Sequence, residues 1–184
     1  MKSLKLLNIE LKNHLEEIKG EFIENLVQML KGENADYLSG KTKTDIKALY
    51  FEYEYDYLDI ITWAADKNGE IITGAVKLPG QRKKQIGESE EWTYFLPENI
   101  WNSASDFQEQ YEEEDDFDDF WDEYNDEKYR LFESWFSDCW KKAAEKAQVT
   151  LDAYFSVHDT YFKTDLNTFT TISDDEIAKR YTSG

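Results

Sequence analysis

The sequence has few of the residues that build disulfides, zinc sites and tight turns. Its 184 residues include one cysteine, two histidines, two prolines and eight glycines. The single cysteine, Cys139, excludes an internal disulfide, and no Cys or His pair has zinc-site spacing. Glycine-rich phosphate loops and nucleophile elbows are also missing. The sequence therefore assigns no metal, no cofactor and no catalytic residue. The scarcity of proline and glycine predicts long elements with few linkers.

Basic residues are also few relative to acidic ones. The chain has 21 Lys and Arg against 40 Asp and Glu, for a formal net charge of −19. This sign argues against a nucleic-acid binder, which needs cations for phosphates, and against an anionic membrane surface. No apolar run approaches the ~18 residues of a spanning helix, and the first residues lack a signal-peptide pattern. We therefore expect a cytoplasmic protein.

The apolar content is high enough for a folded core. Hydrophobic residues make up 40% of the chain and aromatic residues 16%, which is more than an intrinsically disordered acidic chain contains. A chain of this length suits one domain and needs no disulfide to stabilise it. The prediction is a single domain over residues 1–184.

Two stretches have the three-to-four-residue apolar period of amphipathic helices. Residues 8–31 show this period, with Asn8 as the expected N-cap and Gly32 as the stop signal. Residues 116–148 carry an aromatic stripe that starts among carboxylates and ends among lysines, an order that suits the helix dipole. The stripe comprises Phe117, Phe120, Trp121, Tyr124, Leu131, Phe132, Trp135, Phe136, Cys139, Trp140 and Ala143.

Other stretches alternate apolar and polar residues or are rich in β-branched and aromatic residues, as strands are. In the first of them, Leu49, Phe51 and Tyr53 share one face, which we expect to face the core. Asn68-Gly69 separates two others and predicts a type I′ hairpin turn. The predicted strands are 48–55, 57–65, 71–76, 92–97 and 149–157.

The order of these elements defines the fold class. Strands and helices do not alternate strictly as βαβ units, so an α+β fold is expected. Specifically, we expect an antiparallel β-meander packed against an N-terminal helix and a long aromatic-rich second helix. A short helix over 174–180 closes the chain, with Ser173 and Glu176 in a capping box.

The acidic residues gather in one segment. Residues 93–184 carry a net charge of −15, against −4 for residues 1–92. Between Asp106 and Glu127 there are 13 carboxylates, six interleaved aromatic residues and no Lys or Arg. The residues of this segment predicted to bind a partner are Glu112, Glu113, Glu114, Asp115, Asp116, Asp118, Asp119 and Asp122.

This segment has three interpretations, of which two stay open. The first is a solvated helix start, although like charges at helical spacing each cost a few tenths of a kcal/mol. The second is a docking face for a basic protein, which carboxylates would steer and aromatic side chains would anchor. The third, a calcium loop starting at Asp116, fails because Phe120 and Trp121 occupy the fifth and sixth positions, where a ligand and a glycine are needed.

Other candidate chemistry is sparse. His158 and Asp159 are adjacent at the end of the last predicted strand and could form a base or ligand pair. His14 is expected at the edge of the core, and Cys139, in mid-helix, is expected to be buried. The basic cluster 82–84 is expected to be a solvated loop, with an anion site or a contact with another copy as alternatives.

The chain resembles small uncharacterised bacterial cytoplasmic proteins, some of which are similar to immunity proteins of polymorphic toxin systems. The resemblance rests on the first helix, the acidic aromatic strand 48–55, the segment Trp92-Thr93-Tyr94 and the acidic second half. It implies an immunity role and carries no functional residue with it.

The functional expectation is a non-enzymatic acidic protein that engages a basic protein partner, such as a toxin that it inhibits. The alternative is a small hydrolase or ligand-binding domain that uses His158 and nearby carboxylates. Mimicry of nucleic acid by the carboxylates is a special case of the first. The sequence leaves the oligomeric state open.

Overall fold

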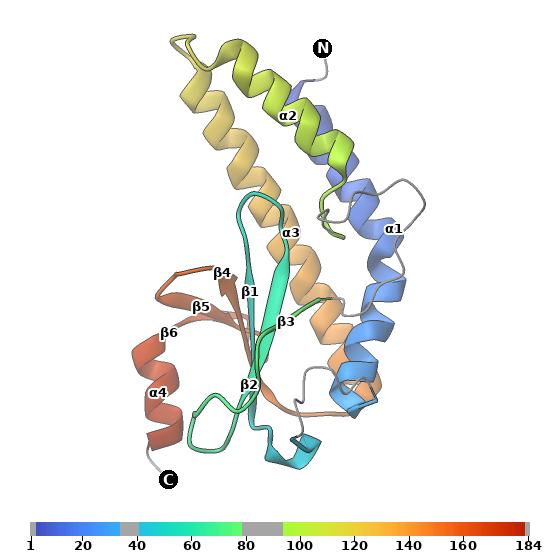
Figure 1. Ribbon diagram of the computed structural model, residues 1–184, viewed down its shortest axis with the longest axis vertical. Coiled ribbons are helices and arrows are strands. Elements are labelled where there is room, and N and C mark those ends of the chain that lie inside the picture. Colours follow the sequence, from blue (N-terminus) through green and yellow to red (C-terminus); the bar gives the residue numbers. More distant parts are fainter. Residues whose placement is uncertain (1–2, 34–40, 79–93, 183–184) are drawn as a thin grey trace.

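The computed structural model describes residues 3–33, 41–78 and 94–182, and within these ranges it confirms the α+β fold (Figure 1). The helices are α1 (Leu4–Lys31), the short 3-10 helix η2 (Lys43–Asp45), α2 (Glu98–Tyr111), α3 (Phe117–Ala147) and α4 (Asp174–Thr182). The strands are β1 (Ala48–Tyr53), β2 (Ile60–Ala65), β3 (Val76–Lys77), β4 (Asp152–Val157), β5 (Phe162–Asp165) and β6 (Thr170–Ser173).

The strands form one mixed sheet in the order β3-β2-β1-β4-β5-β6. Its first half, β1 to β3, is the predicted antiparallel meander. The strand predicted over 71–76 was wrong in extent, because Ile71 forms only an isolated bridge with Ala65 and the strand itself is Val76–Lys77. The second half of the sheet, β4 to β6, is another antiparallel meander, and the sequence patterns predict only the first of its strands. The two halves meet at the centre, where β4 pairs in parallel with β1 from Ala48↔Asp152 to Tyr53↔Val157.

One face of the sheet packs against α1 and α3, which run side by side (Figure 1). Phe51 on β1 contacts Phe136 on α3, with ring centroids 5.3 Å apart, and Phe136 stacks on Phe155 of β4 at 4.1 Å. The Trp135 indole donates a 2.8 Å hydrogen bond to the Leu15 carbonyl and so joins the two helices. The predicted core face of β1 is thus confirmed for Leu49, Phe51 and Tyr53.

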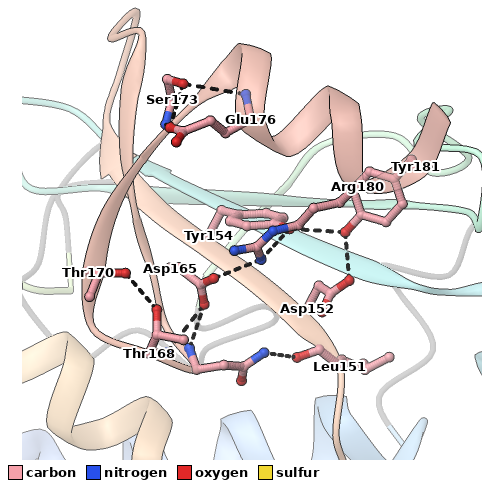
Figure 2. Close-up of polar contacts among 11 residues, drawn as sticks. Leu151, Asp152, Tyr154, Asp165, Thr168, Thr170, Ser173, Glu176, Arg180 and Tyr181 are labelled. Carbon is pink, nitrogen blue, oxygen red and sulfur yellow. Dashed lines mark hydrogen bonds and ion pairs between the residues drawn. The ribbon is translucent and has the colours of Figure 1, made fainter. Parts of the chain in front are cut away.

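The opposite face of the sheet is partly covered by α4. The sequence patterns predict this helix at the right residues, but they do not predict which face of the sheet it covers. Ile177 of α4 packs in a small buried cluster with Ala48, Tyr154 and Ile172. The predicted capping box is confirmed: the Ser173 backbone N–H donates to Glu176 at 2.9 Å, and the Glu176 N–H donates to the Ser173 hydroxyl at 3.4 Å (Figure 2).

A polar network fixes the end of α4 to the sheet (Figure 2). Arg180 donates to Oδ2 of the buried Asp165 at 2.7 Å, and the Tyr181 hydroxyl donates to Asp152 at 2.8 Å. The other Asp165 oxygen accepts the Asn167 backbone N–H at 2.9 Å. Both oxygens of the buried carboxylate therefore have donors, and the network stabilises the position of α4.

Two local predictions were wrong. α1 begins at Leu4 with Ser3 as its N-cap, so Asn8 lies inside the helix with 2% of its surface exposed and is not a cap. In the turn before β3, only Gly69 has a positive φ (+78°), and its N–H donates to the Asp66 carbonyl at 3.0 Å. A type I′ turn needs positive φ at both central residues, so this is a different turn, tightened by the Asp66 side chain.

The segment before α2 also differs from the prediction. Residues 94–96 form bends instead of a strand, and Pro97 is the N-cap of α2. Phe95 nevertheless belongs to the core, fully buried and edge-on to Phe22 at 5.2 Å. Trp92 and Thr93 lie outside the described residues. No apolar stripe identified in the sequence predicts α2 itself.

Candidate protein-interaction surface

The α2–α3 hairpin brings the predicted partner-binding carboxylates together at one end of the molecule. The hairpin turn lies at the end far from α4 and most of the sheet, beside the start of α1 (Figure 1). All eight side chains predicted from the sequence are exposed there. We call these residues the acidic tip: Glu112, Glu113, Glu114, Asp115, Asp116, Asp118, Asp119 and Asp122.

The acidic tip has no countercharge of its own. Across the described ranges, none of its eight side chains takes part in an ion pair or a side-chain hydrogen bond. Asp116 is the N-cap of α3 but makes no capping bond, and only Asp118 and Asp119 lie in the first turn, where the helix dipole favours them. At the border of the tip, Lys5 pairs with Glu123 at 3.4 Å. The local potential is therefore strongly negative.

An apolar groove of about 260 Å³ lies next to the acidic tip, between the start of α1 and α3. Leu4, Phe107, Phe120 and Tyr124 form its walls, and we call it the tip groove. Phe120 belongs to the aromatic stripe predicted for α3 but is not a core residue, because 56% of its surface is exposed. The α3 stripe is wider than the surface that α1 and α2 cover, so Phe120 is left at the edge.

A buried amide also lines the tip groove. Asn8 donates through Nδ2 to the Tyr124 carbonyl and to Glu127 Oε2, both at 3.1 Å. Its Oδ1 atom is buried and has no hydrogen-bond partner among the described residues. An unpaired buried acceptor costs about 1–3 kcal/mol. Glu123 and Glu127 add two carboxylates to the lining and Lys5 adds one ammonium group, so the groove keeps a net negative charge that favours a cationic occupant.

The alternative site around His158 is less enclosed. His158 Nδ1 lies 3.0 Å from Asp159 Oδ2, so the predicted pair does form. The His158 side chain is 39% exposed and that of Asp159 is 87% exposed. Neither residue lines the tip groove, a pocket between α2 and α3, or a groove between α1 and α3. The His158–Asp159 pair therefore belongs to none of these three cavities.

The other candidate residues from the sequence are His14, Cys139 and the basic cluster 82–84. The His14 ring nitrogen Nε2 donates to the Tyr94 carbonyl at 3.0 Å and so fixes α1 to the segment before α2. Cys139 is fully buried, and burial raises the pKa of its thiol to about 12, which disfavours the nucleophilic thiolate. The basic cluster 82–84 lies outside the described residues.

The described ranges also offer no metal site: no group of three His, Cys, Asp or Glu side chains in them could hold an ion. Residues 117–127, which a calcium loop would need in a turn conformation, are helical. Among the described helices, none is apolar enough over a sufficient length to cross a membrane.

Sequence reasoning located the carboxylates but missed the groove beside them. Asn8 was interpreted as a cap, and Phe107 belongs to a helix that was not predicted. The spacing of Ile100, Ala104 and Phe107 after Pro97 is a signal that could have revealed α2. No protein-family model matches the chain, and neither a curated protein nor a solved structure is significantly similar to it.

Proposed function

We propose that this chain is a non-enzymatic binding protein whose acidic tip and tip groove engage a basic protein. The observation that carries the proposal is the concentration of eight exposed, unpaired carboxylates at one end of the molecule, beside an apolar groove. In the immunity-type form of the proposal, the partner is a basic toxin that the chain inhibits by covering its cationic surface.

The acidic tip would act mainly on the rate of association. A surface of one charge sign steers an oppositely charged protein and raises its association rate by about 10 to 1,000-fold, an effect that salt screens. The unpaired state of the carboxylates supports this role, because no internal ion pair has to break when a partner approaches.

The tip groove would provide the anchor that steering alone does not give. Lysine and arginine bury their aliphatic stems on apolar surfaces while their charged heads contact carboxylates. In the tip groove, Phe120 and Leu4 offer the apolar surface, and Glu123 and Glu127 offer the carboxylates. Together these groups suit one inserted basic residue of the partner.

The test compares the wild type with two variants that remove the same number of charges. The acidic-tip variant carries the substitutions Asp115→Asn, Asp116→Asn, Asp118→Asn and Asp119→Asn. The control variant changes four exposed carboxylates elsewhere and carries Glu17→Gln, Glu21→Gln, Glu70→Gln and Glu145→Gln. Proteins retained from a cell lysate at low salt are identified, purified and measured by surface plasmon resonance over a series of salt concentrations.

We expect a basic partner whose association rate falls with salt. The acidic-tip variant should bind it at least about tenfold more weakly, whereas the control variant should bind it like the wild type. Phe120→Ser should increase the dissociation rate and leave the association rate unchanged. Equal affinity of the acidic-tip variant and the wild type, or no protein that distinguishes them, would contradict the proposal.

A further inference from the structure

A second cavity, of about 320 Å³, lies between α2, α3 and the turn that joins β1 to β2. Figure 1 shows this turn rising from the sheet towards the two helices. We call the cavity the Lys128 pocket, because Lys128 of α3 lines it. Its volume is at the lower end of the roughly 300–1,000 Å³ typical of small-molecule sites. It shares Tyr124 with the tip groove but no other lining residue among those described.

Lys128 is an unusual residue for such a position. Only 6% of its surface is exposed, and its ammonium group has no hydrogen bond or ion pair within the described ranges. Its charge is placed over aromatic rings instead, with Nζ 4.8 Å from the centre of the Tyr129 ring and 5.5 Å from that of Tyr124. The one carboxylate among the described lining residues, Asp56, is exposed and lies beyond ion-pair distance.

Burial of an unpaired cation is unfavourable, and proteins usually avoid it. Burial lowers the pKa of Lys128 to about 8, although Asp56 opposes this shift. The side chain therefore still carries its charge at pH 7. Contact with aromatic faces recovers part of the lost hydration. A bound anion would recover more, because it would supply the missing partner.

The rest of the pocket combines aromatic rings with polar side chains of α2 and α3. Trp101 lies against Tyr57, with ring centroids 5.8 Å apart and planes within 23°, and Trp121 lines the pocket from α3. Aromatic walls of this kind favour a planar apolar body. Asn125 accepts the Tyr129 hydroxyl through Oδ1 at 3.4 Å, which leaves its amide N–H groups to donate to a second ligand oxygen.

The number of charged side chains that line the pocket indicates how many negative charges a ligand can carry. The described lining supplies one cation and one carboxylate, in a chain whose net charge is −19. A monoanion is matched by Lys128 alone, whereas a phosphate dianion would bring a second negative charge that no described lining residue neutralises. The cation and the amide group together match the two oxygens of a carboxylate.

We propose that the Lys128 pocket binds a small aromatic monocarboxylate, with its carboxylate on Lys128 and its ring among Trp101, Trp121 and Tyr57. This site does not depend on the acidic tip, and either proposal can fail without the other.

The test is a titration followed by ¹H–¹⁵N NMR at the indole N–H signals of Trp101 and Trp121, which Trp→Phe variants assign. The probes are benzoate, phenylacetate and indole-3-acetate, with phenylacetamide as an uncharged match and phenyl phosphate as a dianion. At least one carboxylate should cause saturable shifts with a Kd of about 1 mM or tighter. Phenylacetamide should bind more weakly than phenylacetate by at least about tenfold.

Two variants separate binding from folding. Lys128→Met should abolish the saturable shifts and raise the melting temperature, because it removes an unpaired buried charge. Lys141→Met removes a charge from an exposed position of the same helix and should leave binding unchanged. No saturable shift with any carboxylate, equal binding by Lys128→Met, or tighter binding of phenyl phosphate would each overturn the assignment.

The pH dependence gives a further readout. The other titratable residues that line the pocket are Asp56 and Tyr57 from the β1–β2 turn and Tyr124 and Tyr129 from α3, and α2 contributes none. Burial raises the pKa of Tyr124 and raises that of Tyr129 to about 12, so both stay neutral near pH 8. Affinity should fall about tenfold from pH 7 to pH 9 as Lys128 loses its proton. A pH-independent affinity would contradict pairing with Lys128.

Discussion

The two ends of the α1–α3 pair carry their charges in different ways. In the C-terminal halves of both helices, carboxylates have countercharges: Asp138 pairs with Lys19 at 3.1 Å and with Lys142 at 2.8 Å, and Lys146 pairs with Glu24. We call this the paired end. At the opposite end, the acidic tip has none within the described ranges. Ion pairs between these helices are therefore available to this fold, and their absence at the tip is not imposed by it.

The two ends also differ in how far their apolar side chains are buried. At the paired end, Trp135 is 5% exposed and stacks on Phe22 with ring centroids 5.1 Å apart. Near the acidic tip, Phe120 has 56% of its surface exposed. The paired end thus contributes mainly to stability, whereas the tip keeps both charge and apolar surface available. Variants at both ends test this division, and a variant of Lys128, which lies between them, tests the cost of an unpaired buried charge.

The largest effect is expected from truncation of the buried aromatic residue. Trp135→Ala should lower the free energy of unfolding by about 3–5 kcal/mol, because it leaves a cavity beside Phe22 and removes the hydrogen bond to Leu15. Phe120→Ala should change it by no more than about 0.5 kcal/mol. Urea unfolding followed by circular dichroism measures both. Similar decreases in the free energy of unfolding of the two variants would contradict the division between a stabilising end and an exposed tip.

Lys128→Met should stabilise the protein by about 1–3 kcal/mol at pH 7, because an unpaired buried charge is replaced by an apolar side chain. The folded pKa of about 8 is below the 10.5 of the unfolded state, so the unfolded chain binds more protons between these pH values. The stability of the wild type should therefore rise from about pH 8 to about pH 10.5, by about 3 kcal/mol from this group. Thermal unfolding at several pH values should show that Lys128→Met lacks this rise.

Asp138→Asn should destabilise the paired end by no more than about 1 kcal/mol, since the ion pairs are partly exposed. Hydrogen bonds from Lys142 and Lys19 lower the pKa of Asp138 below 3.8. Its contribution to stability is therefore complete above that value and is lost as the pH falls through the folded pKa. Urea unfolding at pH 7 and pH 3 should show a smaller difference between variant and wild type at pH 3. An equal difference at the two pH values would mean that the ion pairs of Asp138 do not contribute to stability.

The smallest effect is expected at the acidic tip. Asp115→Asn should stabilise the protein by a few tenths of a kcal/mol at low salt, because it relieves repulsion between like charges. High salt should remove this gain by screening. Thermal unfolding at low and high salt measures the change. A loss of stability instead would mean that the carboxylate has a structural role and would weaken the proposed binding function.

Local patterns predicted the fold class and its longest elements. The period of three to four residues located α1 and α3, and the Ser173–Glu176 capping box located α4. α2 was missed because its buried residues are few, Ile100 and Ala104, and its other positions are mostly polar. The parallel pairing of β1 with β4 could not be predicted, because it joins distant residues and no local pattern encodes it.

The candidate sites show the same limit. The acidic tip was predictable because all its residues lie in one stretch, whereas the tip groove needs Asn8 and Leu4 from the other end of the chain. Lys128 had a usable signal, since it follows Tyr124 by four residues and therefore lies on the same face of α3. Its isolation from acceptors depends on the tertiary packing of α2 and the β1–β2 turn.

The central pairing of β1 with β4 has a consequence for how the chain folds during synthesis. The paired residues are about a hundred positions apart, so the first hairpin leaves the ribosome long before its neighbour exists. Until residues 152–157 have been made, β1 exposes an unpaired edge with Leu49, Phe51 and Tyr53 beside it. Exposed apolar edges of this kind promote aggregation. Formation of the sheet should therefore be a late and slow step, and the half-made chain should be the form that most needs a chaperone.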